Sequence, residues 1–142
     1  MGTNVKRYLL DTNILIYFFA DTLPVQEIPK IEHILKESFN ISIITKIEFF
    51  GFEKYSQDEF SRELEFIGHA TVIPLTDEIA DRVIDLRRKI RIKIPDAVIA
   101  ATCLDGDFTL ITRNEKDFLD IAGLELYNPF TEETSGFRDT TG

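Results

Sequence analysis

The sequence predicts an α/β fold with a central, mostly parallel five-stranded sheet flanked by helices. The chain has 142 residues, of which 44% are hydrophobic, and this is enough for one domain with one core. Short apolar runs alternate with longer segments of helical period, as in βαβ units. Each short run is mostly apolar, as expected of a strand that is covered on both faces.

The expected strands are short, and helical segments separate them. They cover residues 8–10, 41–44, 71–73, 109–111 and 125–127. Before the second strand, one helical face carries Ile31, Ile34 and Leu35, and after the third strand one face carries Ile79, Val83, Leu86 and Ile90. We expect the domain to cover residues 1–130. The tail 131–142 is rich in Thr, Gly and charged residues and is predicted to be disordered.

Composition and charge exclude several classes of protein. The net charge of -9 argues against a basic protein that coats DNA and against a membrane-surface binder. It is compatible with a nuclease, because carboxylates that hold divalent cations are themselves acidic. The single cysteine, Cys103, excludes an intrachain disulfide and a multi-cysteine metal site. No apolar run approaches the length of a membrane span, so the expected location is the cytoplasm, with no membrane partner.

Four carboxylates follow the expected strands or begin a helix. Asp11 directly follows the first strand, Glu48 lies just past the second, and Asp117 follows the fourth. Asp96 lies at the start of a helix, in the segment Pro95-Asp96-Ala97. Open α/β sheets place their sites at the carboxyl ends of their strands. All four carboxylates can therefore converge on one crevice.

Each carboxylate also has a structural interpretation when it is taken alone. Thr45 and Glu48 have the spacing of a capping box, Asp96 can be an N-cap, and Asn114 with Asp117 resembles a weaker capping pair. Taken together, the four are harder to explain, because carboxylates near a core repel one another unless a cation neutralises them. A crevice of carboxylates without His or Cys suits Mg²⁺ or Mn²⁺, and these ions typically act on phosphodiesters.

Four segments carry a resemblance to a known family: residues 10–17, 47–49, 95–102 and 110–118. In this order and spacing they resemble the motifs of PIN-domain ribonucleases, most closely the VapC-type toxins of VapBC toxin–antitoxin systems. The resemblance extends over residues 7–128 and implies a single PIN-like domain. Residue by residue, the acidic quartet of the family corresponds to Asp11, Glu48, Asp96 and Asp117, and the supporting polar residues to Thr12, Asn13, Thr112 and Asn114.

The resemblance also implies an activity, a cofactor and partners. The activity is endonucleolytic cleavage of RNA that leaves a 5′-phosphate and depends on Mg²⁺ or Mn²⁺. In this interpretation Asp11, Asp96 and Asp117 are catalytic metal ligands, whereas Glu48 is a ligand or orients a bound water. The implied partners are a protein antitoxin and a second copy of the chain in a homodimer.

A basic segment precedes Asp96 and is our candidate RNA-backbone contact. It contains Arg87, Arg88, Lys89, Arg91 and Lys93, with Arg82 one turn earlier. The alternative is a solvated helix end, where cations are favoured by the helix dipole. A second unusual stretch is aromatic: Phe49, Phe50, Phe52, Tyr55 and Phe60. We expect most of these rings in the core and the rest in a groove for a dimer partner or an antitoxin.

Two other classes of protein are alternatives. Phosphoryl-accepting domains also place an Asp at the end of a strand, and non-catalytic PIN-like scaffolds keep the same fold. A phosphoryl-accepting domain, such as a receiver or a haloacid-dehalogenase-like phosphatase, fits poorly because the phosphatase pattern needs a second Asp where this chain has Asn13. A receiver also needs an acidic pair before the accepting Asp and a suitably placed late Lys. A non-catalytic PIN-like scaffold that binds a protein is expected to lose one or more of the four carboxylates, and all four are present.

Overall fold

The computed structural model describes residues 6–52 and 56–130, so the expected tail 131–142 lies outside the described residues. The sheet has five strands in the order β3-β2-β1-β4-β5, and every neighbouring pair is parallel. The strands are β1 (Tyr8–Leu10), β2 (Asn40–Ser42), β3 (Thr71–Ile73), β4 (Thr109–Ile111) and β5 (Leu126–Tyr127). The predicted α/β class is confirmed. The strand order differs from the 2-1-3-4-5 order of receiver domains, which removes that alternative.

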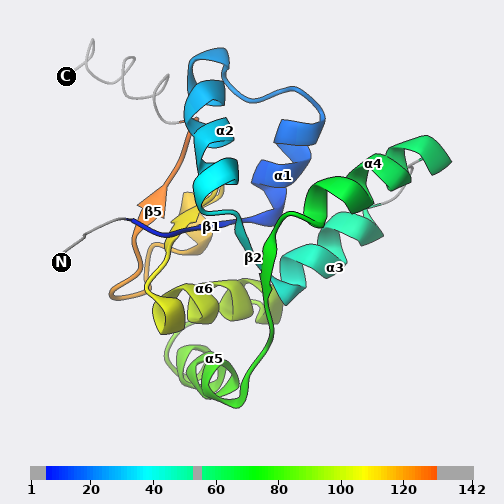
Figure 1. Cartoon of the computed structure of the whole chain (residues 1–142). Coiled ribbons are helices and arrows are strands. Elements are labelled where there is room, and N and C mark those ends of the chain that lie inside the picture. The colour runs from blue at the N-terminus through cyan, green and yellow to red at the C-terminus, as the bar shows by residue number, and fades with distance from the viewer. Residues whose placement is uncertain (1–5, 53–55, 131–142) are drawn as a thin grey trace, which may run out of the picture.

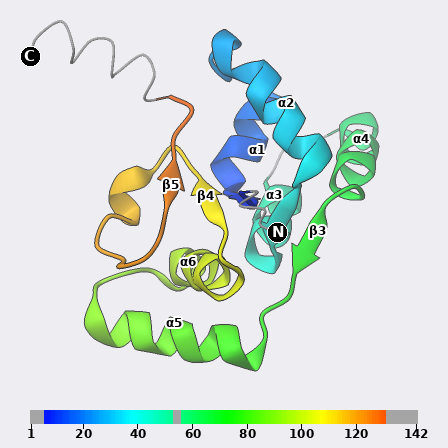
Figure 2. The same ribbon diagram turned by 60° about the vertical axis from the view of Figure 1, so that its left-hand side comes forward.

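Helices cover both faces of the sheet. The α-helices are α1 (Thr12–Phe19), α2 (Ile28–Glu37), α3 (Ile43–Gly51), α4 (Gln57–Ile67), α5 (Asp77–Lys89) and α6 (Ile94–Gly106), and the short 3₁₀ helices are η1 (Val25–Glu27) and η2 (Glu115–Asp117). Helices α1 and α2 lie on one side of the sheet, and α5 and α6 lie on the other (Figure 1, Figure 2). Helices α3 and α4 run side by side and extend away from the sheet (Figure 1).

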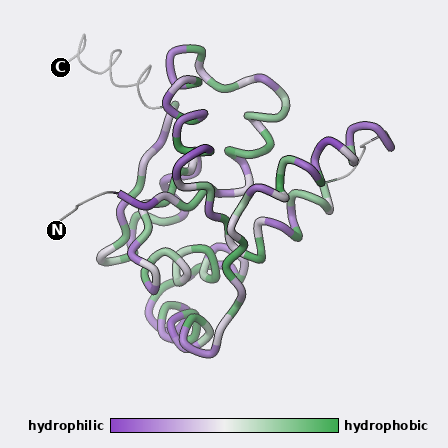
Figure 3. The backbone as a smooth tube through the Cα atoms, viewed as in Figure 1, coloured by the Kyte–Doolittle hydropathy of each residue, from purple (hydrophilic) through white to green (hydrophobic). Residues whose placement is uncertain are grey.

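The core has two parts, one on each face of the sheet, because successive strand residues point in opposite directions. Leu10 and Ile111 are fully buried beneath α1 and α2, whereas Leu9 and Leu110 are fully buried beneath α6. This explains why the strands are apolar throughout. Helix α5 lies outside α6 and alternates between hydrophilic and hydrophobic residues, as expected of a helix with one solvated face (Figure 3).

The second strand is shorter than predicted, and helix α3 begins earlier. The strand ends at Ser42, whose buried hydroxyl accepts a hydrogen bond from the Ile44 amide at 3.0 Å and caps α3. Ile43 and Ile44 are therefore helical, although their side chains favour strands. The expected capping box at Thr45 and Glu48 is wrong, because both residues lie inside α3. The last strand also begins one residue late, at Leu126.

Two other capping interpretations are also corrected. The N-cap of α6 is Lys93, and Asp96 lies in the first turn of the helix. Asn114 occupies the N-cap position of η2, but its side chain makes no capping hydrogen bond, and Asp117 lies within η2. None of the helices in the described part of the chain has the length and apolarity that crossing a membrane requires.

The aromatic stretch divides between core and surface. Phe49 is fully buried and Phe50 packs against the same core. Phe52 and Phe60 are 47% and 41% exposed, so about half of the described rings of this stretch are surface residues. Tyr55 lies outside the described residues.

Candidate active site

Asp11 lies at the carboxyl end of β1 and is the buried member of the predicted quartet. Its amide donates to the Ile111 carbonyl at 2.9 Å, which continues the pairing of β1 with β4. Its carboxylate caps α1 by accepting from the Thr12 amide at 2.8 Å, and it also accepts from the Thr112 hydroxyl at 2.7 Å. Asp11 is only 6% exposed. These bonds hold the carboxylate in one orientation at the edge of the sheet.

Asn13 and Thr112 extend this network across the end of β4. The Asn13 amide nitrogen lies 3.3 Å from the second carboxylate oxygen of Asp11, and the Asn13 side-chain oxygen accepts from the Arg113 amide at 3.3 Å. Thr112 is fully buried, and its hydroxyl oxygen also accepts from the Asn114 amide at 3.0 Å. Thr112 and Asn13 therefore join β1, α1 and the loop after β4 around one carboxylate.

Thr12 joins Asp11 to Glu48. The Thr12 hydroxyl donates to Glu48 Oε1 at 2.6 Å, and its oxygen lies 3.2 Å from the hydroxyl oxygen of the buried Thr45. Thr12 and Asp11 are adjacent, whereas Glu48 and Thr45 are one turn apart on α3. Helix α3 thereby presents an exposed carboxylate beside the buried one.

The carboxylates line two adjoining pockets that share Asp96. The first pocket has a volume of about 530 Å³ and is lined by Asp11, Glu48 and Asp96, with Thr12, Asn13 and Asn114. The second has a volume of about 470 Å³ and is lined by Asp96 and Asp117. The structure therefore brings Asp11, Glu48 and Asp96 to one hollow and places Asp117 on the far side of Asp96.

Charge repulsion connects the members of the quartet. Burial raises the pKa of Asp11 from 3.8 to about 6; the hydrogen bonds from Thr112 and Thr12 oppose this shift, and the charges of Asp96 and Glu48 add to it. The pKa of Asp96 is also raised, first by burial and then by the charges of Asp117 and Glu48, while Lys93 opposes the shift. The charge of Asp96 therefore acts on Asp11, and the charge of Asp117 acts on Asp96. Such repulsion is what a bound cation removes.

The donor set fits a hard divalent cation, although the four side chains are not gathered around one point. Carboxylate, hydroxyl and amide oxygens line the first pocket, without His or Cys, and these are the ligands that Mg²⁺ and Mn²⁺ prefer. Within residues 6–52 and 56–130, no group of three or more His, Cys, Asp or Glu side chains is placed so that it could hold a metal ion. Joint ligation of one ion therefore requires the carboxylates to move closer together.

The predicted RNA-contact residues do not act as one patch. Arg87, Arg91 and Lys93 line the second pocket with Asp96 and Asp117. Arg87 donates to the Ile92 carbonyl at 2.6 Å and so stabilises the turn after α5. Lys89 pairs with Asp85 at 3.0 Å, and Arg88 lies in a separate hollow formed by residues 87–92. Arg82 pairs with Asp105 on the other side of α5.

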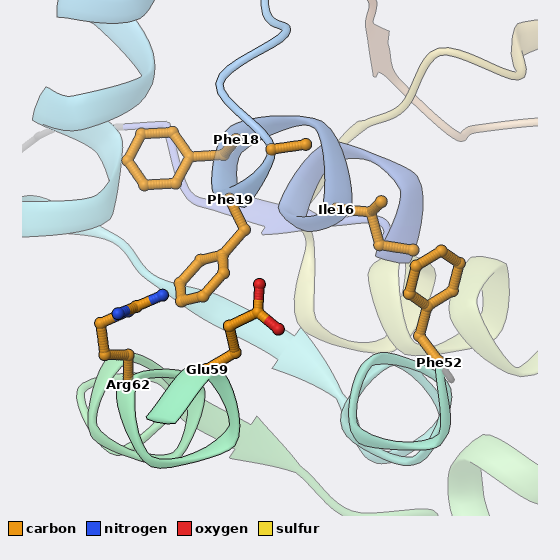
Figure 4. A pocket seen from close by; sticks show the side chains of 7 residues that line it. Ile16, Phe18, Phe19, Phe52, Glu59 and Arg62 are labelled. Carbon is orange, nitrogen blue, oxygen red and sulfur yellow. The ribbon is translucent and has the colours of Figure 1, made fainter. Parts of the chain in front are cut away.

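A third pocket continues from the first along α1 and α4. It has a volume of about 390 Å³ and shares Ile16 and Phe52 with the acidic pocket. Figure 4 shows Phe18 and Phe19 of α1 above it, with Glu59 and Arg62 rising from α4 on the opposite side. The exposed Phe52 lies beside Ile16, and these two residues line both pockets (Figure 4). An apolar groove with a charged rim therefore leads to the carboxylates.

Sequence reasoning missed three residues of these pockets. Lys116 and Asp120 line the second pocket beside Asp117, and Ile16 lies where the apolar and acidic pockets meet. The adjacency of Lys116 to Asp117 is a signal in the sequence for the first. The position of Asp120 depends on how the loop after η2 turns, and no spacing indicates it.

Comparisons with known proteins point to one family. A family model described as PIN domain matches residues 8–124. Among curated protein sequences, none matches the chain significantly.

Several solved structures share the fold, and VapBC toxin–antitoxin complexes are among them. A toxin–antitoxin complex from Klebsiella pneumoniae is 34% identical over 87% of this chain and 98% of that chain, with a TM-score of 0.71. VapBC2 from Rickettsia felis, bound to a DNA fragment from its promoter, is 25% identical over 85% of this chain and 97% of that chain, with a TM-score of 0.72. DNA-bound VapBC from Salmonella typhimurium shares the fold. It is 19% identical over 88% of this chain and 99% of that chain, with a TM-score of 0.76.

Proposed function

The chain belongs to the PIN-domain family, and from this premise we propose that it is an Mg²⁺- or Mn²⁺-dependent endoribonuclease and the toxin of a toxin–antitoxin pair. The observation that carries the proposal is the first pocket, where Asp11, Glu48 and Asp96 face one hollow and repel one another. Ionised carboxylates that lie close together beside a core are costly for folding. They are explained when a cation and a phosphodiester occupy the pocket.

In this proposal Asp11, Asp96 and Asp117 are metal ligands, and Glu48 is a ligand or positions a water. A bound Mg²⁺ or Mn²⁺ activates water and stabilises the leaving oxygen of a phosphodiester. Thr112, Asn13 and the Thr12 amide keep the Asp11 carboxylate in its orientation, and the Thr12 hydroxyl holds Glu48. Asn114 lines the same pocket and is available to contact the substrate.

The proposed partner is a protein antitoxin that occupies the apolar groove. The groove offers Phe18, Phe19 and Phe52, and its floor continues into the acidic pocket through Ile16. A bound segment of an antitoxin can therefore bury these rings and reach the carboxylates at the same time. The structural neighbours are crystallised as toxin–antitoxin complexes, which supports this part of the proposal. We also propose that the chain forms a homodimer and acts in the cytoplasm.

The test compares RNA ends formed in cells that express the wild type, Asp96→Asn or the control Asp81→Asn. Asp81 is exposed on α5 and lies outside the acidic pockets, so the control makes the same chemical change elsewhere. We expect new 5′-monophosphate RNA ends and growth arrest with the wild type and Asp81→Asn, and neither with Asp96→Asn. Identical ends in all three would contradict the proposal. Failure of the purified protein to bind Mn²⁺ would favour a non-catalytic scaffold.

A further inference from the structure

The segment between α5 and α6 alternates apolar and basic residues. Ile90 and Ile92 pack in the core beneath the two helices, and the backbone is extended at Ile90 and Lys93. Because alternate side chains of an extended segment point in opposite directions, the buried isoleucines leave Arg91 and Lys93 facing outward. The Arg87 bond to the Ile92 carbonyl holds the segment in place. The two exposed cations are therefore presented by a rigid support.

These cations meet a third one at the second pocket. Lys116 projects from η2, beside Asp117, and lines the same hollow as Arg91 and Lys93. The ion pairs between described residues join other cations to carboxylates, namely Lys6 to Glu125, Arg82 to Asp105 and Lys89 to Asp85. Arg87 also lines this pocket, so four cations surround it beside the carboxylates of Asp96, Asp117 and Asp120, and Asp96 also belongs to the first pocket.

Lys93 occupies a position where a lysine is unfavourable for the fold. It is the N-cap of α6, and its side chain makes no capping hydrogen bond. Ser, Thr, Asp and Asn are preferred there because they accept from the free amides of the first turn, and a cation opposes the helix dipole. The charge of Lys93 instead favours the ionised form of Asp96, and a residue that breaks a local rule in this way is typical of a functional position.

We propose that Arg91, Lys93 and Lys116 form a phosphate-binding subsite that holds the backbone of single-stranded RNA next to the active-site carboxylates. The proposal rests on the proposed nuclease function and identifies where the substrate chain leaves the acidic pocket. It assigns a substrate contact to Lys116, whereas Arg87, which also lines the pocket, stabilises the turn through its bond to the Ile92 carbonyl.

The test measures binding of a fluorescently labelled single-stranded RNA to full-length chains that carry Asp11→Asn, which prevents cleavage. In this background we expect Lys93→Ser and Lys116→Ser each to weaken binding about four-fold at about 0.15 M salt. Each should also reduce the slope of log affinity against log salt by about 0.7. The triple variant with Arg91→Ser should bind roughly fifty-fold more weakly. The control Lys36→Ser removes the same charge from the last turn of α2 and should leave affinity and slope unchanged.

Thermal unfolding of the same variants separates a substrate contact from a structural role. Lys93→Ser should leave Tm nearly unchanged, because the serine cap offsets the loss of the charge that favours ionised Asp96. Unchanged affinity and salt slope in the variants, or weaker binding together with a lower Tm for Lys93→Ser, would overturn the subsite. If the background chain binds no RNA, both the subsite and the proposed function are wrong. Weaker binding of the variants without new RNA ends in cells would leave the subsite standing and overturn the nuclease.

Discussion

Replacing Asp11 with Asn should stabilise the metal-free protein at neutral pH while it removes activity. In the folded chain the pKa of Asp11 is raised from 3.8 to about 6. The difference of about 2 pK units corresponds to roughly 3 kcal/mol by which ionised Asp11 destabilises the fold. Asn carries no charge, and its side-chain oxygen can still accept from the Thr12 amide and cap α1.

The gain is reduced by the loss of one hydrogen bond. The Thr112 hydroxyl donates to Asp11 Oδ2 at 2.7 Å, and an amide nitrogen in that place cannot accept it. Losing a bond of this kind costs about 1 to 2 kcal/mol. We therefore expect Asp11→Asn to increase the free energy of unfolding by about 1 to 2 kcal/mol at pH 7.5, or Tm by roughly 3 to 8 °C.

The pH dependence identifies the cause. Above pH 6 Asp11 is ionised in both folded and unfolded chains, so the full penalty on the wild type is present. As the pH falls from about 6 toward 4, the folded wild type takes up a proton before the unfolded chain does. The wild type is thereby stabilised relative to Asp11→Asn. Because the cost of the lost Thr112 bond remains at every pH, the advantage of the variant should disappear near pH 5 and become a deficit near pH 4. For the control Asp81→Asn we expect no such change with pH.

The assay is urea unfolding of the wild type, Asp11→Asn and Asp81→Asn between pH 4 and 8 in the presence of a chelator, repeated with Mn²⁺. Mn²⁺ at about 100 times its Kd should stabilise the wild type by about 2.7 kcal/mol and Asp11→Asn much less. A constant deficit of Asp11→Asn at every pH would refute the reasoning, because it would mean that Asp11 serves the fold as a cap.

Two further variants test the supports of the site. Thr12→Val keeps the shape of the side chain but removes its hydroxyl bond to Glu48. Mn²⁺ affinity, measured by calorimetric titration, should fall about 10- to 100-fold. The circular dichroism spectrum should be unchanged. An unchanged affinity would show that the orientation of Glu48 is irrelevant to the metal. Ser42→Ala removes the cap of α3 and should cost about 1 to 2 kcal/mol in urea unfolding, whereas a neutral effect would show that the Ile44 amide finds another partner.

Much of the fold could be predicted because its determinants are local. Each strand is short and apolar, since both of its faces are buried, and each is bounded by a helical period that is easy to recognise. The carboxylates at Asp11 and Asp96 stand out because they adjoin apolar segments. Their common sheet edge follows from parallel pairing, which the alternation of elements already indicates.

What could not be predicted depends on contacts between distant segments. The run Ile41-Ser42-Ile43-Ile44 favours a strand throughout, and only the capping bond of the Ser42 hydroxyl turns it into a helix after two residues. The separation of Asp117 from the first pocket depends on the path of η2, and the exposure of Phe52 depends on how α3 leaves the sheet. Spacing along the chain contains none of this information.

The net charge of -9 is a poor guide to whether the chain binds RNA, because charges act over a limited distance. At physiological salt the Debye length is about 8 Å, so exposed acids on distant helices are largely screened. An RNA phosphate in the second pocket is close to Arg91, Lys93 and Lys116. The carboxylates of Asp96, Asp117 and Asp120 also line this pocket and repel that phosphate, and a cation bound at Asp96 and Asp117 reduces the repulsion. Attraction of RNA and binding of a divalent cation should therefore be coupled, and RNA affinity should rise when Mn²⁺ is added to the wild type.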